Sequence, residues 1–466
     1  MAPGSKYQID MCHGPLFGKV LLFSIPLMVS NIMQVLFNAV DLVIIGRFAS
    51  SNSLAAVGAC GSLTSLFLNF FFGLSAGANV VVARCIGARQ GKQTSHAVHT
   101  AMALAFWGGI ALAVVGFFAA RPALVLMGTP PEVLPKSTIY MRLFALLVPL
   151  ILFYNYGSAI LRAAGDTRRP LIFMLVAGVI KVALTFMLVR FCRLDVAGLV
   201  IASILANSVA VFLIIRALSG ARDHSRLWID RIRFCQESLR DILKIGVPAG
   251  IQGSLFGLSN VVIQSAINSF GPAAMAGNAA AGSLEGIVYV GFNAYYYSTI
   301  SFVGQNYGAK KYKRLLRSFF YTMILAVATA AVLGWSMFLM GRPLLACYNP
   351  DPEVIRWGLL RMRYLILPYL LCAAMEVLSG GLRGLGHSFT PMIVTLLGAC
   401  VFRVAWVWWI LPLDRTMNTL LLSYPVSWLL VLTVNGGLLY FVVRRLFRQT
   451  AHPGGENSSR HVTLRV

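Results

Sequence analysis

The sequence predicts an all-α polytopic membrane protein with twelve transmembrane helices in two six-helix bundles, and three observations support this fold class. Of the 466 residues, 58% are hydrophobic and only 12% are charged, about half of the charged share of a soluble domain. The apolar residues form repeated runs that are long enough to cross a hydrocarbon core about 30 Å thick. Related motifs recur in the two halves of the chain, and the short alternating segments of a β-barrel are not found.

Each apolar run ends at basic, proline or glycine residues, and together the runs define the twelve spans. The least marked division lies between the fifth and sixth spans, where only RFCRLD (190–195) separates two apolar stretches. The expected spans are 17–46, 54–83, 97–120, 138–160, 170–190, 195–218, 245–269, 273–303, 318–341, 357–380, 390–411 and 417–442.

Lysine and arginine indicate how these spans are oriented. With the N-terminus inside the cell, 26 of the 39 basic residues lie on the inner side, 11 lie in outer loops or at outer span ends, and two lie within spans. Because basic residues are enriched in cytoplasmic loops, this distribution predicts a multi-pass protein of the plasma (inner) membrane with both termini in the cytoplasm. It also accounts for the net charge of +24 without a nucleic-acid partner.

The two halves of the chain resemble each other. The segments LRAAGDTRRP (161–170) and LRGLGHSFTP (382–391) share Leu, Arg, Gly and Pro, and Pro26 opens the first span as Pro248 opens the seventh. Each half has an even number of spans, so the two repeats insert with the same orientation, related by an axis along the membrane normal. The expected parts are an N-terminal lobe (1–218), a cytoplasmic linker (219–244), a C-terminal lobe (245–442) and a basic cytoplasmic tail (443–466).

A polar stripe surrounds an acid in the first span. Its members are spaced by three or four residues and therefore share one helix face, which in a membrane points toward protein or a water-filled cavity. They are Asn31, Gln34, Asn38 and Asp41, and the seventh span carries a second stripe of Gln252, Asn260, Gln264 and Asn268. Two interpretations follow: the stripes face a shared cleft, or they join helices by hydrogen bonds.

Two further acids and two cations lie within spans of the sequence. Glu285 shares a helix face with polar residues that include Asn293, whereas Glu376 lies near the cytoplasmic end of its span. Lys181 and Arg403 occupy corresponding positions of the two repeats, and an intramembrane cation usually has a partner.

Counted from the outer span ends, Lys181 reaches the depth of Asp41, and Arg403 is nearer in depth to Glu285 than to Glu376. A carboxylate–cation pair in each lobe is therefore expected. Such pairs are either structural, or they form a site where a proton, a sodium ion or a cationic substrate compete for one carboxylate.

Several motifs together resemble the multidrug and toxic compound extrusion (MATE) transporters over nearly the full chain. They are IPLMVSNIMQVLFNAVDLVIIGRFASSNSLAAVG, GLSAGANVVVARCIGARQGK, ILRAAGDTRRP, SLEGIVYVGFNAYYYSTISFVGQNYGAKK and GGLRGLGHSFTP. The resemblance implies a V-shaped secondary antiporter that expels organic cations in exchange for protons or sodium ions, with no other cofactor. It places Asp41 on the family's first-helix acid and Glu285 on the acid of the bacterial branch.

The fifth span departs from the family pattern. Many relatives carry Asn and, four residues later, Asp, which form a cation site with the first-helix acid; here Lys181 and Thr185 take these places. The departure disfavours a sodium site in the first lobe and favours proton coupling through Asp41 and Lys181. The candidate residues for substrate and cation coupling are Asp41, Asn38, Gln34, Lys181, Thr185, Glu285, Asn293, Gln264, Glu376 and Arg403.

Other functions fit the sequence less well. A lipid-linked oligosaccharide flippase is the alternative, since it shares this architecture, but such proteins have more spans and a strongly cationic cavity. All seven histidines lie in termini, loops or loop edges, and no cysteine pair has metal-ligand spacing, which disfavours an intramembrane enzyme or a metal site. The expected partners are small organic cations and the lipid bilayer, and the expected state is a monomer.

Overall fold

The computed structural model describes residues 7–49 and 51–451, and the described residues form helices and connections without a β-strand. The N-terminal half contains α1 (Leu16–Phe48), α2 (Ser51–Gly87), α3 (Gly91–Leu126), α4 (Leu134–Ala163), α5 (Arg168–Arg190) and α6 (Asp195–Ser219). A connection with a short 3₁₀-helix (Ile229–Arg231) leads to α7 (Gln236–Asn268), α8 (Pro272–Gly308), α9 (Tyr312–Leu339), α10 (Gly341–Ala346), α11 (Pro352–Leu365) and α12 (Tyr369–Gly384).

The last two spans of the second half are helical throughout. One consists of α13 (Phe389–Thr395) and α14 (Phe402–Ala405), joined and followed by π-helical stretches (Leu396–Val401 and Trp406–Ile410). The other is α15 (Met417–Ala451).

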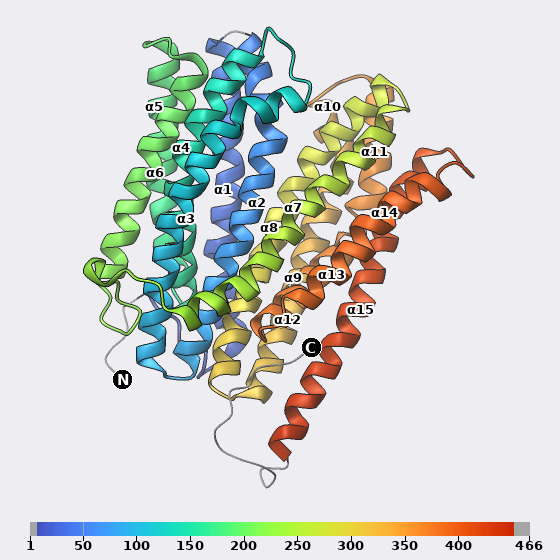
Figure 1. Cartoon of the computed structure of the whole chain (residues 1–466). Helices are drawn as coiled ribbons and strands as arrows, with labels where there is room; N and C mark the ends of the chain where they lie inside the picture. The colour runs from blue at the N-terminus through green and yellow to red at the C-terminus, as the bar shows by residue number, and fades with distance from the viewer. Residues whose placement is uncertain (1–6, 50, 452–466) are drawn as a thin grey trace.

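The helices gather into two lobes (Figure 1). Helices α1 to α6 lie in one lobe and α8 to α15 in the other. Helix α7 starts beside the first lobe, at the end where α1 also starts, and runs obliquely into the second lobe. The start of α1 and the end of α15 lie at the same end of the molecule, which we call the terminal end; the other is the distal end. The predicted two-bundle fold is therefore confirmed.

Most expected spans are present, with longer helices than the hydropathy pattern suggests. Among the described residues, ten helices are long and apolar enough to cross a membrane, and the bent pair α11–α12 makes eleven. The remaining expected span, the eighth (273–303), corresponds to helix α8; its 37 residues suffice in length, but its polar residues lower its hydropathy. The weakly marked division at 190–195 is correct, because α5 ends at Arg190 and α6 begins at Asp195.

Three of the helices differ from the expected ranges. The tenth span is not a single helix over 357–380, because the chain bends by 44° between α11 and α12, just before Tyr369, where Pro368 cannot donate a backbone hydrogen bond. Helix α7 begins at Gln236, so the second part of the expected linker is helical. Helix α15 continues to Ala451 beyond the expected span end, and the rest of the tail lies outside the described residues.

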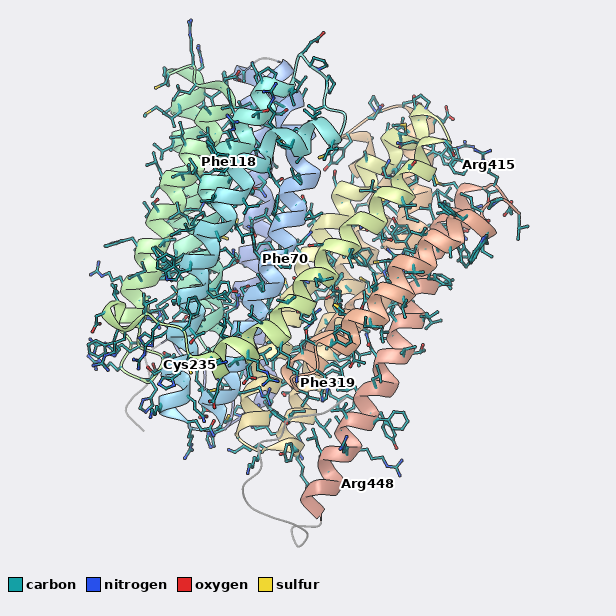
Figure 2. All side chains as sticks on the ribbon, in the orientation of Figure 1. Phe70, Phe118, Cys235, Phe319, Arg415 and Arg448 are labelled. Atoms are coloured by element: carbon teal, nitrogen blue, oxygen red, sulfur yellow. The ribbon has the colours of Figure 1, made fainter. Side chains whose placement is uncertain are left out.

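The lobes touch through glycines in their terminal halves. A Cβ atom added to Gly73 of α2 would lie 2.2 Å from the backbone nitrogen of Gly250 in α7, and one added to Gly308 of α8 would lie 2.0 Å from the carbonyl oxygen of Arg84. Phe70 lies between the lobes beside this contact (Figure 2). Glycine therefore allows the two backbones to pack directly against each other.

Toward the distal end the same helices separate. A Cβ atom added to Gly58 of α2, Gly257 of α7, or Gly282 and Gly286 of α8 would have no neighbour within 4 Å. The hydrogen bond from Ser254 of α7 to the carbonyl of Leu66 in α2, 3.2 Å long, lies near the point where the contact ends. The space between the lobes is thus closed at the terminal end and open at the distal end.

The N-terminal segment adds to the closure at the terminal end. Lys311 and Arg314 donate hydrogen bonds to backbone carbonyls of residues 11–14. Burial alone would raise the pKa of Asp10, but hydrogen bonds from Cys12 and His13, with nearby positive charge, lower it below its ordinary value. This segment therefore ties the first lobe to the α8–α9 turn of the second.

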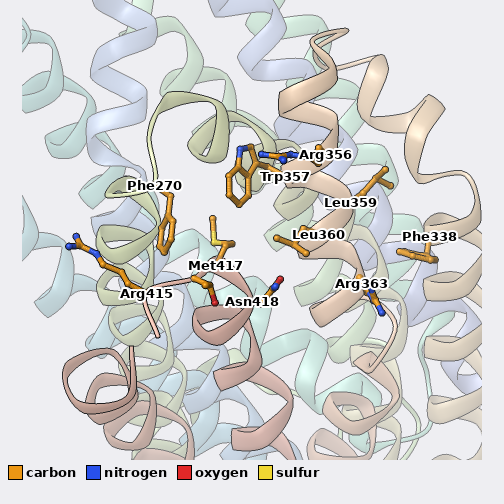
Figure 3. Close-up of a pocket in the computed structure, with 11 residues that line it drawn as sticks. Phe270, Phe338, Arg356, Trp357, Leu359, Leu360, Arg363, Arg415, Met417 and Asn418 are labelled. Carbon is orange, nitrogen blue, oxygen red and sulfur yellow. The ribbon is translucent and has the colours of Figure 1, made fainter. Parts of the chain in front are cut away.

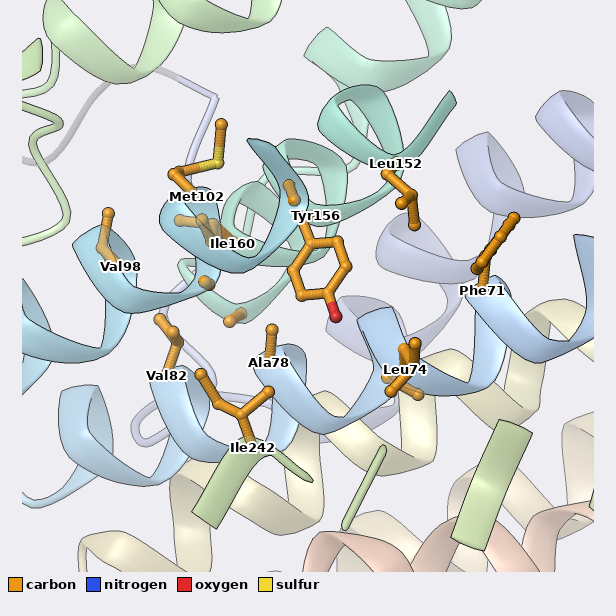
Figure 4. Close-up of a cluster of buried hydrophobic side chains, with 14 of the residues drawn as sticks. Phe71, Leu74, Ala78, Val82, Val98, Met102, Leu152, Tyr156, Ile160 and Ile242 are labelled. Carbon is orange, nitrogen blue, oxygen red and sulfur yellow. The ribbon is translucent and has the colours of Figure 1, made fainter. Parts of the chain in front are cut away.

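The core and the surface of the lobes agree with a membrane environment. The buried cluster of the first lobe packs α2, α3 and α4 together and includes Ile242 of α7 (Figure 4). Large apolar side chains such as Phe118 on α3, which is 73% exposed, cover outward faces (Figure 2). Such faces are stable in contact with lipid, whereas in water they would favour aggregation.

Gly73→Ala is expected to lower the thermal stability of the purified protein and to weaken the closed terminal contact. The added methyl meets backbone, which cannot rotate away as a side chain can. Gly58→Ala in the same helix is the matched control, because it faces open space and gains about 0.5–1 kcal/mol of helix preference. Circular dichroism melting of both variants checks this; an equal stabilisation by both substitutions would contradict the contact.

Candidate functional site

An ion pair connects α1 and α5 inside the first lobe. The Nζ atom of Lys181 lies 2.5 Å from Oδ2 of Asp41, and Thr185 donates a weak hydrogen bond to Oδ1 over 3.5 Å. The side chains of Asp41 and Lys181 are 7% and 19% exposed. The structure thus contains the carboxylate–cation pair that the depth argument predicts for this lobe.

Local packing explains how the two charged residues meet. Phe37 lies one turn before Asp41 on α1, and its ring packs directly on Gly178 of α5. A Cβ atom added to Gly178 would lie 1.9 Å from the Phe37 ring, so only glycine fits there. Gly178 in turn lies one turn before Lys181. Since residues three or four apart share a helix face, the close contact at Phe37 brings the next turn of each helix into contact.

The polar residues of α1 divide into two groups. Asn31 donates a hydrogen bond to the carbonyl of Val290 in α8, 3.1 Å away, so it joins the two lobes. Gln34 and Asn38 are exposed and have no hydrogen bond to other described residues. The first residue supports the hydrogen-bonding interpretation of the stripe, whereas the other two leave polar groups accessible next to the ion pair.

The acid of the second lobe has a different partner from the expected one. Glu285 of α8 accepts hydrogen bonds from Arg361 of α11, at 2.6 Å from Nη2 and 3.1 Å from Nε, and from the Tyr369 hydroxyl at 2.7 Å. The side chains of Arg361 and Glu285 are 11% and 15% exposed. The carboxylate is therefore bound by a guanidinium and a phenol together.

A chain of amides extends this contact into α7. Arg361 also donates to the side-chain oxygen of Asn278, Asn278 donates to Gln264 over 2.8 Å, and Gln264 donates to Asn268 over 2.9 Å. Gln264 therefore joins helices by hydrogen bonds. Asn260 and Asn268 of the second stripe are exposed, so the hydrogen-bonded contact uses only part of the stripe.

Arg403 does not pair with Glu285, so the expected pair of the second lobe is wrong. Arg403 is fully buried, donates from Nε to Ser427 over 2.9 Å, and lies 4.3 Å from the ring centre of Tyr424. Its two terminal nitrogens have no hydrogen-bond partner among the described protein residues. The aromatic rings around it provide the favourable interaction that the sequence assigned to a carboxylate.

The other candidates of the second lobe lie apart from the Glu285 contact. Asn293 donates to the hydroxyl of Tyr289 over 3.3 Å. Arg383, which was not among the candidates, donates hydrogen bonds to Gln252 of α7 over 2.7 Å and to the hydroxyl of Tyr296. Glu376 is half-buried and forms no ion pair or hydrogen bond with the described residues.

Sequence reasoning missed Arg361, Tyr369 and Arg383 as partners of buried polar groups. The tenth span was expected to begin at residue 357, which places Arg361 at the outer rim. Because α11 begins at Pro352, Arg361 lies nine residues along the helix, roughly 13 Å from its start. Asp351 caps the start of α11, because its side chain accepts a hydrogen bond from the backbone N–H of Glu353 over 2.8 Å. An aspartate before Pro352 is the sequence signal that would have located the first residue of this helix.

The residues described here contain no group of three or more His, Cys, Asp or Glu side chains that could hold a metal ion. The buried charges instead form pairs. Asp41 and Glu285 are each bound to a cation of the same lobe, while Arg403 is left without a carboxylate.

Comparison with known families finds the MatE model in two segments of the chain, 26–187 and 248–409. The two matched segments begin at Pro26 and Pro248, so they coincide with the internal repeat inferred from the sequence. Together they cover well over half of the chain.

Several curated bacterial proteins are similar along most of their length. The probable multidrug resistance protein YoeA of Bacillus subtilis (strain 168) is 25% identical over 384 residues, 80% of this chain and 82% of its own. The multidrug export protein MepA of Staphylococcus aureus (strain NCTC 8325 / PS 47) is 21% identical over 428 residues, 90% of this chain and 91% of its own. A FAD transporter of Shewanella oneidensis is 27% identical over 373 residues, 76% of this chain and 80% of its own.

Solved structures share the fold. An outward-facing multidrug resistance MATE family transporter of the MOP superfamily has a TM-score of 0.88 at 20% identity, covering 96% of this chain and 99% of that one. A MATE protein in the bent conformation has a TM-score of 0.87 at 20% identity, covering 95% and 98%.

Proposed function

The chain belongs to the MatE family, a family of membrane transporters and not of enzymes, and from this premise we propose that it is a secondary active multidrug efflux antiporter. It exports organic compounds by alternating access in exchange for protons or sodium ions. The multidrug resistance and export proteins among its relatives support the direction and the breadth of transport. None of the relatives named above is described as a lipid flippase.

The observation that carries the proposal is the Asp41–Lys181 ion pair beside accessible amides. Asp41 is nearly buried, yet Gln34 and Asn38 on the same helix are exposed on the part of α1 beyond its contact with Val290. An acid in this position is close to the space that opens between the lobes at the distal end. It is therefore placed to meet a proton or a cationic substrate from that side.

The chemistry of the pair explains the exchange. The carboxylate of Asp41 has one close cation, and in this structure Lys181 fills that place. When a proton binds Asp41, the attraction is lost and the ammonium of Lys181 becomes an uncompensated charge, which favours a different packing of α1 against α5. A cationic substrate that reaches Asp41 displaces Lys181 in the same way, so proton and substrate compete.

A proton fits this site better than a sodium ion does. Sodium needs several oxygen ligands, and a nearby ammonium repels it, whereas Asp41 and Thr185 offer few oxygens and Lys181 already occupies the position. Glu285, Asn293, Gln264, Glu376 and Arg403 stay candidates for the second lobe. Among them Glu376 has a carboxylate that no described residue binds.

Transport by inverted membrane vesicles tests the proposal. Vesicles with the protein are expected to move ethidium when energised and to lose this movement when the pH gradient is dissipated. Proteoliposomes under an imposed proton or sodium gradient then identify the coupling ion. Gradient-independent lipid translocation without movement of ethidium would instead support the flippase.

Lys181→Asn is expected to move the pH profile of transport to higher pH. Lys181 favours the ionised form of Asp41, so without it the carboxylate binds a proton at a lower proton concentration. The measurement is the initial rate of ethidium efflux between pH 6 and pH 9, with Lys136→Asn as the control, since Lys136 pairs with Asp195 away from this site. An unchanged profile would make Lys181 a structural residue.

A further inference from the structure

A pocket of about 620 Å³ lies at the distal end of the second lobe, away from the Asp41–Lys181 pair. It is bordered by α11, the first turn of α15, the α7–α8 turn and the end of α9 (Figure 3). Its volume is in the range of pockets that bind small molecules, about 300–1,000 Å³. The residues that line it are Phe270, Phe338, Arg356, Trp357, Leu359, Leu360, Arg363, Arg415, Thr416, Met417 and Asn418.

The pocket has an apolar centre and a basic rim. Trp357, Leu360 and Met417 lie toward its middle, whereas Arg363 and Arg415 lie toward opposite sides (Figure 3). No lining residue is acidic. This separation of apolar surface and positive charge matches a ligand that is itself divided into an apolar body and an anionic group.

The arginines at the rim differ in whether they already interact with a carboxylate or an aromatic ring. Arg356 is 4.0 Å from Glu353 and lies over the ring of Trp357, 5.0 Å from its centre. Within the described part of the chain, neither Arg363 nor Arg415 has an ion-pair partner. The neighbouring carboxylate of Asp414 accepts hydrogen bonds from Thr416 and Thr419 instead, so two guanidinium groups remain for a ligand.

We propose that this pocket binds an amphipathic organic anion. The apolar body packs on Trp357, Leu360 and Met417, and a carboxylate, sulfonate or phosphate group binds a guanidinium of the rim, that of Arg363 on one side or that of Arg415 on the other. Two sources offer this chemistry: a soluble organic anion, or the headgroup and upper chain of an anionic phospholipid. The proposal concerns binding at equilibrium and does not depend on the proposed transport reaction.

Binding of pyrenebutyrate and of its neutral amide tests the pocket. The protein is held in phosphatidylcholine nanodiscs at pH 7, and empty nanodiscs give the partition of each probe into lipid. We expect the anion to bind at least about tenfold more tightly than the amide. The double variant Arg363→Gln with Arg415→Gln should lower the affinity for the anion about tenfold or more and change the affinity for the amide by no more than about twofold.

Arg342→Gln is the matched control, because Arg342 is an exposed arginine at the same end of the same lobe that does not line the pocket. Equal affinity of the wild type and the double variant for the anion, or equal affinity of the wild type for both probes, would overturn the proposal. A further arm replaces part of the phosphatidylcholine with phosphatidylglycerol: loss of probe binding assigns the site to a lipid headgroup, and unchanged binding assigns it to a soluble anion.

Discussion

Asp41→Asn is expected to abolish ion-coupled efflux while the protein still inserts into the membrane. An amide keeps the size of the side chain and still accepts a hydrogen bond from Lys181, but it neither ionises nor takes up a proton near neutral pH. Because exchange depends on two states of one carboxylate, a side chain with a single state should bind without coupling. The expected result is efflux at the background rate and no response to the pH gradient.

Asp195→Asn provides the matched control for this loss. Asp195 also pairs with a lysine, Lys136, at 2.5 Å, but the pair lies at the start of α6 and its side chains are 29% and 33% exposed. Pairs of this exposure contribute little to stability, typically less than about 1 kcal/mol. Near-normal, gradient-driven ethidium efflux by Asp41→Asn would refute the assignment of Asp41, whatever the control shows.

The stability of Asp41→Asn has to be measured alongside transport. Removing one partner of a buried ion pair costs up to about 3–5 kcal/mol, and here less, since Lys181 is 19% exposed and keeps access to solvent. A fluorescence-detected size-exclusion profile with a single peak shows that the variant is folded. Loss of transport together with a normal profile then reports on coupling rather than on folding.

The two lobes show how far depth along a helix predicts contacts. In the first lobe, depth counted from the outer span ends correctly predicted the contact of Asp41 with Lys181. It did so because α1 and α5 are continuous helices in direct contact at Phe37 and Gly178. Composition and the repeat likewise sufficed for the helical class and the two bundles. These features depend on the spacing of residues along single helices, which the sequence records directly.

In the second lobe the same estimate failed because the helices are irregular. Arg403 lies between two π-helical stretches, where an additional residue in a turn rotates the following side chains about the helix axis. Arg361 lies on α11, which is bent away from α12 and starts earlier than its hydropathy indicates. Neither the extra residue in a turn nor the bend leaves a clear signal in apolar periodicity, so the partner of Glu285 could not be identified.

Breaking the Glu285–Arg361 pair is expected to have the largest effect on stability. Arg361 links Glu285 to Asn278 and through it to α7, so Arg361→Met removes contacts among three helices and leaves a carboxylate with only the Tyr369 hydroxyl. Removing one partner of such a buried ion pair lowers the free energy of unfolding by about 3–5 kcal/mol. The double variant Glu285→Gln with Arg361→Met should recover part of it, because no uncompensated charge remains.

The two single variants should respond differently to pH, because only one of the two charges can be removed by a proton. In Arg361→Met the carboxylate of Glu285 loses its guanidinium and keeps only the Tyr369 hydroxyl, so its negative charge is left uncompensated unless a proton neutralises it. Its loss of stability is therefore larger at pH 8 than at pH 5.5. In Glu285→Gln the guanidinium stays charged at any accessible pH, and the loss is the same at both.

Thermal unfolding at pH 5.5 and pH 8, with Arg342→Met as the control for an exposed arginine of the same lobe, measures these differences. A pH-independent loss in Arg361→Met would mean that another cation or solvent compensates Glu285. The buried Arg403, whose terminal nitrogens have no hydrogen-bond partner among the described residues, is the residue that would supply the cation. Arg361→Met with Arg403→Met distinguishes the two cases: a pH response that returns in this double variant shows that Arg403 had taken the carboxylate, and one that stays absent shows that Glu285 is reached by solvent.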